Sequence, residues 1–263
     1  MQNLKNVLLN IVIEYIKYRW NAKGRHVIHS PFIYDLVDDA LKIPFDDASR
    51  SKLTTLFSDL SRDKRNIRTI DLGAGSKTLN NNRTVSEIFK VCSSKGKYGK
   101  LLYQLSRHYN FKNILELGTS LGVGTIQLQL GNPNAQITTV EACFETHKIA
   151  NENFSKLGFS EIKSINAEFV KYLSDPGNII FDLVFIDGDH NGTSLLNYLK
   201  LLKPITHKDT VFVLDDIRWS KSMLNAWNTI VQDECFNVTL DLFRLGIAIN
   251  RNQQQKEHFQ LKL

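Results

Sequence analysis

The chain has 263 residues, of which 42% are hydrophobic, so it can form one large domain, or a domain with an appendage, around a substantial core. Its 33 Lys and Arg exceed its 27 Asp and Glu and give a formal net charge of +6. No run of five or six basic residues occurs, which disfavours a nucleic-acid-binding tail. The three cysteines are far apart and form no C-x-x-C pair. This argues against a zinc site and favours a reducing compartment, which we expect to be the cytoplasm.

Apolar residues recur at helical spacing from Leu4 to Ile16 and predict an amphipathic helix. Asn10, Glu14 and Lys17 interrupt the apolar run before it reaches the 18 residues that a membrane-spanning helix requires. The helix is expected to cover the rest of the protein or a partner subunit, as in a homodimer. Peripheral membrane contact, through the Lys and Arg side chains nearby, is the less favoured alternative.

Further helices are predicted before residue 110. Ser30 and Pro31 suit the N-cap and the first residue of a helix. His26 and His29 precede this helix, and binding to loop backbone groups is favoured for them over contact with a substrate. The other helical patterns cover residues 46–60, 84–91 and 98–109. We therefore expect residues 1–110 to be a helical N-terminal region on the substrate side or at an oligomer contact.

A glycine-rich turn follows an apolar segment in the middle of the chain. Residues 114–125 read I-L-E-L-G-T-S-L-G-V-G-T, which predicts a strand, a sharp turn and the start of a helix. Gly118, Gly122 and Gly124 let the backbone turn and approach a bound molecule, as at the ligand-binding corner of a doubly wound α/β sheet. The spacing differs from G-x-G-x-x-G, which disfavours a nicotinamide cofactor.

A second strand, residues 136–141, ends on Glu141. In this architecture the carboxylate after the second strand accepts the hydroxyl donors of a nucleoside ribose. A water-exposed glutamate at a strand end is the alternative. Its distance from the glycine turn favours the cofactor interpretation.

Two more buried strands end in acids. Residues 183–186 precede Asp187, and residues 210–214 precede Asp215 and Asp216. Carboxylates at one edge of a sheet repel one another, and a bound cation or a donor-rich ligand would relieve that repulsion.

Residues 69–76, T-I-D-L-G-A-G-S, also read as a cofactor loop. The residues after them are polar and begin no amphipathic helix, and no acid-ended strand follows at the right distance. We therefore reject this segment as the cofactor loop and expect residues 71–83 to lie at the surface or to form a lid. A contribution to the acceptor site is the alternative.

After residue 142 helices and strands alternate, as in a doubly wound sheet. The predicted helices cover 145–157, 194–202 and 219–231, and the predicted strands cover 161–165, 236–240 and 243–249. The last two strands are close enough in sequence to be an antiparallel hairpin. Trp219 either packs at the start of its helix, which is favoured, or faces a substrate.

The combination of E-L-G-x-x-x-G, Glu141, F-I-D-G-D-H and V-L-D-D resembles the catechol and caffeoyl-CoA type O-methyltransferases and their bacterial relatives, methyltransferase family 24. The resemblance covers residues 111–250. It implies an α/β fold over residues 111–263, with a Rossmann-like, seven-stranded, mostly parallel sheet and a C-terminal antiparallel hairpin. The implied cofactor is S-adenosylmethionine. Its expected binding residues are Glu116, Gly118, Thr119, Ser120, Gly122, Thr125, Glu141, Ala167, Glu168 and Asp187.

By position, Asp187, Asp215 and Asp216 match the divalent-metal ligands of that family, for Mg²⁺ or Mn²⁺. Asp216 departs from the usual Asn and adds a negative charge. His190 stands where the family has its catalytic lysine, and histidine can accept a proton near neutral pH. His190 and Asp187 are therefore the expected catalytic residues.

The resemblance implies methyl transfer from S-adenosylmethionine to a hydroxyl of a small molecule, assisted by a metal. Two alternatives stay open. One is a metal-independent methyltransferase in which the carboxylates bind the substrate directly. The other is a catalytically idle, cofactor-binding interaction protein. An amino-methylase of nucleic acid is disfavoured because Asp187-Gly188-Asp189 replaces its N/D-P-P-aromatic motif.

Overall fold

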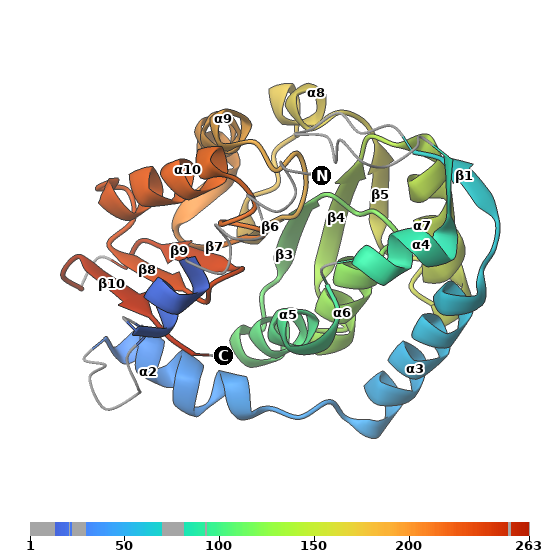
Figure 1. The fold of residues 1–263 in the computed structure, drawn as a ribbon, viewed down its shortest axis with the longest axis horizontal. Helices are drawn as coiled ribbons and strands as arrows, with labels where there is room; N and C mark the ends of the chain where they lie inside the picture. The colour runs from blue at the N-terminus through green and yellow to red at the C-terminus, as the bar shows by residue number, and fades with distance from the viewer. Residues whose placement is uncertain are drawn as a thin grey trace.

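An eight-stranded sheet forms the centre of the protein (Figure 1). This computed structural model describes residues 14–20, 22, 30–69, 82–92, 94–251 and 254–262. The strands, in their order across the sheet, are β10 (Glu257–Gln260), β8 (Val238–Asp241), β9 (Gly246–Ile249), β7 (Thr206–Leu214), β6 (Phe181–Ile186), β3 (Asn113–Leu117), β4 (Gln136–Glu141) and β5 (Lys163–Asn166).

Most of the sheet is parallel, which confirms the predicted α/β class. Strands β5, β4, β3, β6 and β7 run in one direction, so their carboxyl ends meet at one edge. Strand β9 runs antiparallel to both β7 and β8, which confirms the C-terminal hairpin. Strand β10 pairs parallel with β8 and raises the number of strands from the expected seven to eight. It has four residues, without an apolar face that would predict a strand.

Helices cover both faces of the sheet (Figure 1). One face carries α2 (Pro31–Asp38), α5 (Gly96–Tyr109) and α6 (Val123–Gly131), and the other carries α8 (Phe169–Ser174), α9 (Gly192–Leu202) and α10 (Lys221–Gln232). Three more helices, α3 (Asp47–Arg62), α4 (Val85–Val91) and α7 (Phe144–Leu157), pack with α6 around a third apolar cluster. Short 3-10 helices lie at Ala40–Lys42 and Lys203–Ile205.

The alternation of side chains along β6 explains why its sequence is almost entirely apolar. Leu183 and Phe185 join the core cluster under α5 and α6, whereas Val184 and Ile186 join the cluster under α9 and α10. A parallel strand between two helical layers is buried on both faces, and residues 183–186 are accordingly all apolar and buried. The functional edge therefore rests on rigid, fully packed strands.

Helix ends agree with the capping signals in the sequence. The hydroxyl of Ser30 accepts a hydrogen bond from the N–H of Ile33, and Pro31 is the first residue of α2, as predicted. Gly158 ends α7 with φ +77°, also as predicted.

Helix α5 packs against both α2 and the sheet, so apolar residues on both sides of residue 110 share one core.

The rejected cofactor loop lies between two strands outside the central sheet. β1 (Asn66–Arg68) and β2 (Asn82–Thr84) pair antiparallel with each other in a separate two-stranded sheet. A dinucleotide-type loop follows a strand of the main sheet, so this arrangement agrees with the rejection. Residues 70–81, His26 and His29 lie outside the described residues, as do the first 13 residues of the chain.

Residues 14–20 are helical, in continuation of the predicted N-terminal amphipathic segment. Within the described ranges, none of the helices combines the length and apolar character needed to cross a bilayer.

Candidate functional site

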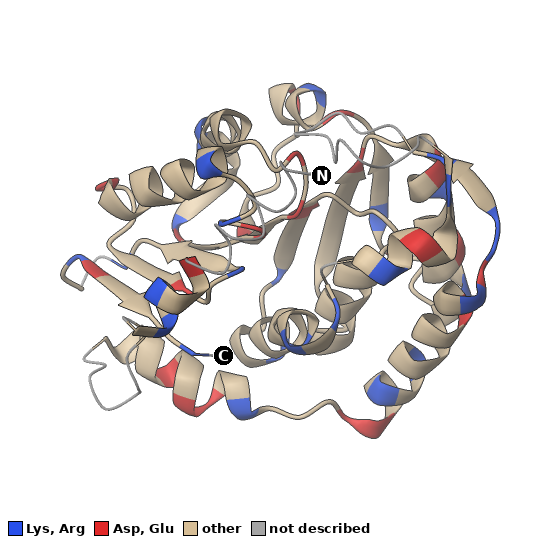
Figure 2. Ribbon diagram, viewed as in Figure 1, with Lys and Arg blue, Asp and Glu red and all other residues tan. Residues whose placement is uncertain are grey.

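The candidate site lies at the edge where the parallel strands end, and Figure 2 shows acidic positions gathering near those ends. After β3 the chain turns at Gly118, which has φ +110°. A Cβ atom there would lie 2.0 Å from the backbone oxygen of Asp187. Only glycine fits this close approach, so the turn after β3 contacts the end of β6 directly.

Glu141 is positioned beside the glycine turn. One carboxylate oxygen accepts the N–H of Ser120 at 2.7 Å, and the other accepts the N–H of Cys143 at 2.8 Å. The first bond holds Ser120 in a left-handed conformation, with φ +48°. Burial raises the pKa of Glu141, and the hydrogen bonds from Cys143 and Ser120 offset part of that shift. An acceptor group therefore stands next to the predicted cofactor loop.

Three of the predicted cofactor residues lie beneath the loop. Glu116 is 1% exposed and accepts hydrogen bonds from the hydroxyls of Thr125 and Thr139, the latter at 2.6 Å. The hydroxyls of Thr119 and Thr139 are 2.5 Å apart. Burial raises the pKa of Glu116 to about 7. The side chains of Glu116, Thr119 and Thr125 thus form an internal network that supports the loop from below.

The end of β5 joins this edge. The Asn166 side chain and the Ala167 N–H both donate to the carbonyl oxygen of Glu141, at 2.7 and 3.1 Å. Glu168 is exposed and is the N-cap residue of α8, but its side chain makes no capping bond. At this position its negative charge can still complement the dipole of α8, so the structure does not decide between that role and adenine contact.

The N-terminal region also reaches the site. The hydroxyl of Ser94 donates to Asp187 at 3.4 Å, and the Gln127 side chain donates to the carbonyl oxygen of Ser94 at 2.5 Å. The ring of Tyr98 lies 5.8 Å from the guanidinium carbon of Arg244. Neither Ser94 nor Tyr98 was predicted, because nothing in the local sequence shows which strand end their segment meets.

Asp215 and Asp216 share one cation, Arg244. The Arg244 Nε atom lies 3.1 Å from Asp215 Oδ1 and 3.0 Å from Asp216 Oδ1. Burial, followed by the charge of Asp215, raises the pKa of Asp216 to about 6, against the opposing effects of Arg244 and His190. The sequence-based picture of three uncompensated carboxylates is therefore wrong for these two residues, since a guanidinium already neutralises part of their charge.

Arg244 was missed because it is 29 residues from Asp215. The signal that could have found it is the pairing of β7 with β9, which places Leu214 opposite Gly246. Continued beyond the last pair, this antiparallel register brings Arg244 next to Asp216. The sequence predicted the two strands but not that they are neighbours.

The arrangement does not fit a divalent metal site as the sequence suggested. Within the described part of the chain, no three His, Cys, Asp or Glu side chains are grouped so that they could hold a metal ion. Asp187 contacts Ser94, while Asp215 and Asp216 turn to Arg244. Against the opposing effect of burial, the charges of Asp215, Asp216 and Asp187 all raise the pKa of Arg244, so the guanidinium lies near all three carboxylates.

His190 lies between a carboxylate and an aromatic ring. Its Nε2 atom is 3.7 Å from Asp216 Oδ2, and its ring centre is 5.7 Å from that of Trp219. Trp219 is 46% exposed and lies just before α10, and its two expected roles, packing at the helix start and facing a substrate, stay predictions. His190, Asp216 and Trp219 form a partly open corner beside Arg244, where a substrate could be oriented and deprotonated.

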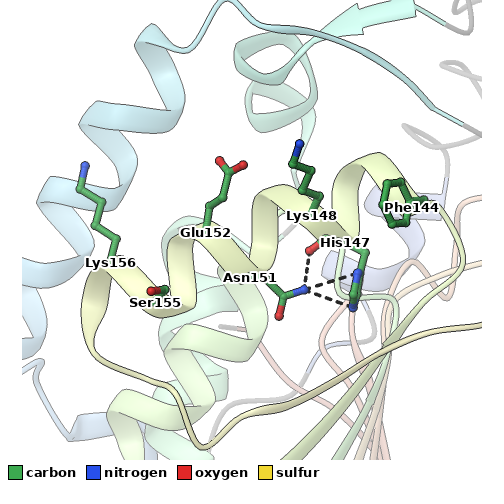
Figure 3. Close-up of a pocket in the computed structure, with 7 residues that line it drawn as sticks. All are labelled: Phe144, His147, Lys148, Asn151, Glu152, Ser155 and Lys156. Atoms are coloured by element: carbon green, nitrogen blue, oxygen red, sulfur yellow. Dashed lines mark hydrogen bonds between the residues drawn. The ribbon is translucent and has the colours of Figure 1, made fainter.

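A shallow pocket also lies along the outer face of α7 (Figure 3). Its lining residues are Phe144, His147, Lys148, Asn151, Glu152, Ser155 and Lys156, all from this one helix. It contains none of the residues at the strand ends, so we do not assign the chemistry to it.

The glycine turn, the acid after the second strand and the sheet order define a Rossmann-like fold with the strand ends arranged to bind a nucleoside cofactor. Residues 115–217 match the family model described as a methyltransferase domain.

Among curated proteins, the chain is similar to a catechol O-methyltransferase of Niastella koreensis, with 29% identity over 132 residues. The match covers 48% of this chain and 58% of that relative. Two solved structures share the fold. An O-methyltransferase from Bacillus cereus in complex with SAH has a TM-score of 0.54 and 18% identity, over 82% of this chain and 95% of that one. The SAH-bound methyltransferase of Podospora anserina has a TM-score of 0.57 and 16% identity, over 86% and 98% of the two chains.

Proposed function

We propose that this protein transfers the methyl group of S-adenosylmethionine to a hydroxyl of a small molecule. The observation that carries the proposal is the Glu141 carboxylate, held by the backbone N–H groups of Ser120 and Cys143 beside the glycine turn. The methyltransferase domain and the O-methyltransferase relative, whose name gives catechol as its substrate class, support the same reaction.

The donor would occupy the β3, β4 and β5 side of the edge. Each oxygen of Glu141 accepts one backbone N–H and keeps further acceptor capacity for a ribose hydroxyl. Ala167 and Glu168, at the end of β5, flank the place expected for the adenine. Gly118 lets the backbone approach the donor closely, while Glu116, Thr119 and Thr125 keep the turn in shape from below.

The acceptor would occupy the β6 and β7 side. The sulfonium donor is already activated, so the protein needs mainly to align the acceptor oxygen with the methyl carbon and to remove its proton. His190 is placed to take that proton, and Asp216 is placed to orient the imidazole and to stabilise its charged form. Trp219 offers an exposed ring against which a planar acceptor could pack.

The proposal takes the metal-independent form that the sequence left open. A Mg²⁺ or Mn²⁺ ion at Asp187, Asp215 and Asp216 would have to compete with Arg244 for two of its three ligands. We place the protein in the cytoplasm because its three cysteines are free thiols, as expected in a reducing compartment. Homodimer formation and peripheral membrane contact stay predictions.

Titration calorimetry with S-adenosylhomocysteine tests the donor site without a known acceptor. The wild-type protein should bind it, and Glu141→Gln should weaken binding by about 1.5–3 kcal/mol, as expected when a charged acceptor is removed from a buried hydrogen bond. Glu234→Gln is the matched control, because Glu234 is 90% exposed and far from the strand ends in sequence.

The melting temperature of each apo variant is measured alongside affinity, since Glu141 also holds the Ser120 turn. Equal affinities of Glu141→Gln and wild type would remove the ribose assignment. Failure of the wild-type protein to bind S-adenosylhomocysteine at all would refute the proposed function.

A further inference from the structure

We propose that the guanidinium of Arg244 permanently takes the place of a divalent cation at Asp215 and Asp216, so that the acceptor half of the site works with a fixed organic cation. This inference rests on the proposed function for its chemistry. The observation behind it is the position of Arg244 Nε, 3.1 Å from Asp215 Oδ1 and 3.0 Å from Asp216 Oδ1.

The contacts of Arg244 are directed at the same two carboxylates that a metal ion would use. Nη2 adds a longer contact of 3.4 Å to Asp215 Oδ2, so both oxygens of Asp215 face the guanidinium. The Asp215 side chain is only 1% exposed, and that of Asp216 is 14% exposed. A guanidinium stays protonated, so an incoming dication would meet a fixed positive charge at these carboxylates.

The fold holds Arg244 in place through a second arginine. Arg218 donates to both oxygens of Asp241, at 2.7 and 2.5 Å, and to the carbonyl oxygen of Phe243 at 2.9 Å. Phe243, directly before Arg244, has φ +73°. The carbonyl oxygen of Arg244 accepts the N–H of Ile217 at 3.0 Å, which ties the turn before β9 to the segment after β7. Arg244 is therefore a built part of the site and not a surface arginine that swings onto nearby acids.

The guanidinium keeps a face toward the acceptor side. Its side chain is 30% exposed, and within the described residues Nη1 makes no hydrogen bond. An N–H donor there can bind the acceptor oxygen and stabilise the negative charge that it acquires as His190 removes its proton. The acceptor oxygen forms a bond to the methyl carbon, and the carbon–sulfur bond breaks with its electron pair on sulfur. The hydroxyl proton passes to the imidazole of His190 and then to water.

Manganese binding, measured by electron paramagnetic resonance and by thermal melting, tests the inference with the metal alone as the probe. The wild-type protein should show no site for Mn²⁺ at these carboxylates, and neither Mn²⁺ nor Mg²⁺ should raise its melting temperature. Arg244→Met keeps the length of the side chain but removes the cation. The exposed carboxylates should then bind Mn²⁺ about tenfold or more tightly than wild type, with a rise in melting temperature.

Two further variants make the result specific. Arg244→Lys restores a positive charge and should again exclude Mn²⁺. Arg65→Met is the matched control, because Arg65 also pairs with two carboxylates, Asp63 and Glu152, but at the surface. It should gain no Mn²⁺ affinity. If Arg244→Met does not fold, Arg244→Gln carries the same expectation.

The inference is overturned if wild type binds Mn²⁺ with thermal stabilisation that Asp215→Asn removes. It is overturned equally if a folded Arg244→Met, or Arg244→Gln in its place, gains no affinity. S-adenosylhomocysteine titrated into the same proteins separates this result from the proposed function. Its affinity should be the same within about twofold in wild type and Arg244→Met, and its failure to bind would count against the donor site while the Mn²⁺ result still decides the role of Arg244.

Discussion

The buried Glu116, which lies beneath the glycine turn, makes the stability of the protein depend on pH. Burial raises its pKa from the ordinary value of 4.5 to about 7, so the folded protein keeps a proton that the unfolded chain has lost between these values. The contribution of Glu116 to stability is therefore fully present below pH 4.5 and is lost as pH rises through 7. A shift of this size corresponds to about 3 kcal/mol.

We expect Glu116→Gln to reduce this loss. Glutamine cannot ionise, and its side-chain oxygen can still accept from the hydroxyls of Thr125 and Thr139. Urea unfolding at pH 5 and pH 8 should show a smaller difference in the free energy of unfolding for Glu116→Gln than for wild type. The exposed Glu234→Gln should keep the wild-type difference, and an unchanged difference in Glu116→Gln would refute the interpretation.

Single residues also show where sequence reasoning succeeded and where it stopped. The position of Glu141 beside the glycine turn was predicted correctly because it depends on a short spacing that one chain segment encodes; its contact with ribose stays a prediction. Arg244 was not found, because its contact with Asp215 depends on which strands are neighbours. Glu116 was assigned to the cofactor surface because a motif specifies a residue type and not the depth of its side chain; it lies beneath the turn.

At the scale of elements, the long strands and helices were predicted closely, because their apolar patterns and caps are local. Predicted residues 136–141 are β4, and predicted residues 145–157 differ from α7 by one residue. The elements that were missed are short: α8 has six residues, and β1, β2 and β10 have three or four. Pairing with partners that are distant in sequence stabilises such strands. A short stretch of sequence does not reveal which partner a strand will pair with.

The turn between β3 and α6 gives a prediction at this scale. Gly118→Ala would combine a positive φ with a Cβ placed 2.0 Å from the Asp187 oxygen, so the turn must move away from β6. We expect this variant to lose measurable binding of S-adenosylhomocysteine in calorimetry and to melt at a lower temperature.

Gly158→Ala is the control for backbone strain alone. Gly158 also has a positive φ, +77°, but nothing lies within 4 Å of the added Cβ. It should cost about 1–2 kcal/mol of stability and leave cofactor affinity unchanged. If Gly118→Ala behaves like Gly158→Ala in both measurements, the contact with β6 does not matter for the site.

At the scale of the whole molecule, one buried ion pair joins segments far apart in sequence. Asp241, whose side chain is 1% exposed, accepts from Arg218 and from the Gln260 side chain. The Arg218 guanidinium lies over the rings of Tyr18 and Phe243, at 5.6 and 5.3 Å. The pair thus connects the helical segment 14–20, the turn that carries Arg244, and strand β10.

Removing one partner of this pair should be costly. Arg218→Met would leave the charge of Asp241 buried without its cation, and we expect a loss of about 3–5 kcal/mol in the free energy of unfolding, measured with urea. Arg65→Met breaks a surface pair and should cost no more than about 1 kcal/mol. If both variants lose the same free energy of unfolding, the buried ion pair stabilises the protein no more than the surface pair does.

Because β10 lies near the end of the sequence, the two halves of the site are completed at different times during synthesis. The donor half, from β3 to β5, and the end of β6 that its glycine turn contacts lie within residues 113–187. The turn that holds Arg244 depends on Asp241, which is completed by Gln260, while Tyr18 donates to the carbonyl oxygen of Leu261. A ribosome that adds 5–20 residues per second reaches residue 261 roughly 4–15 s after residue 187. During that interval a nascent chain could form the donor pocket without the groups that activate an acceptor, so synthesis itself delays chemistry until the opposite edge of the sheet is closed.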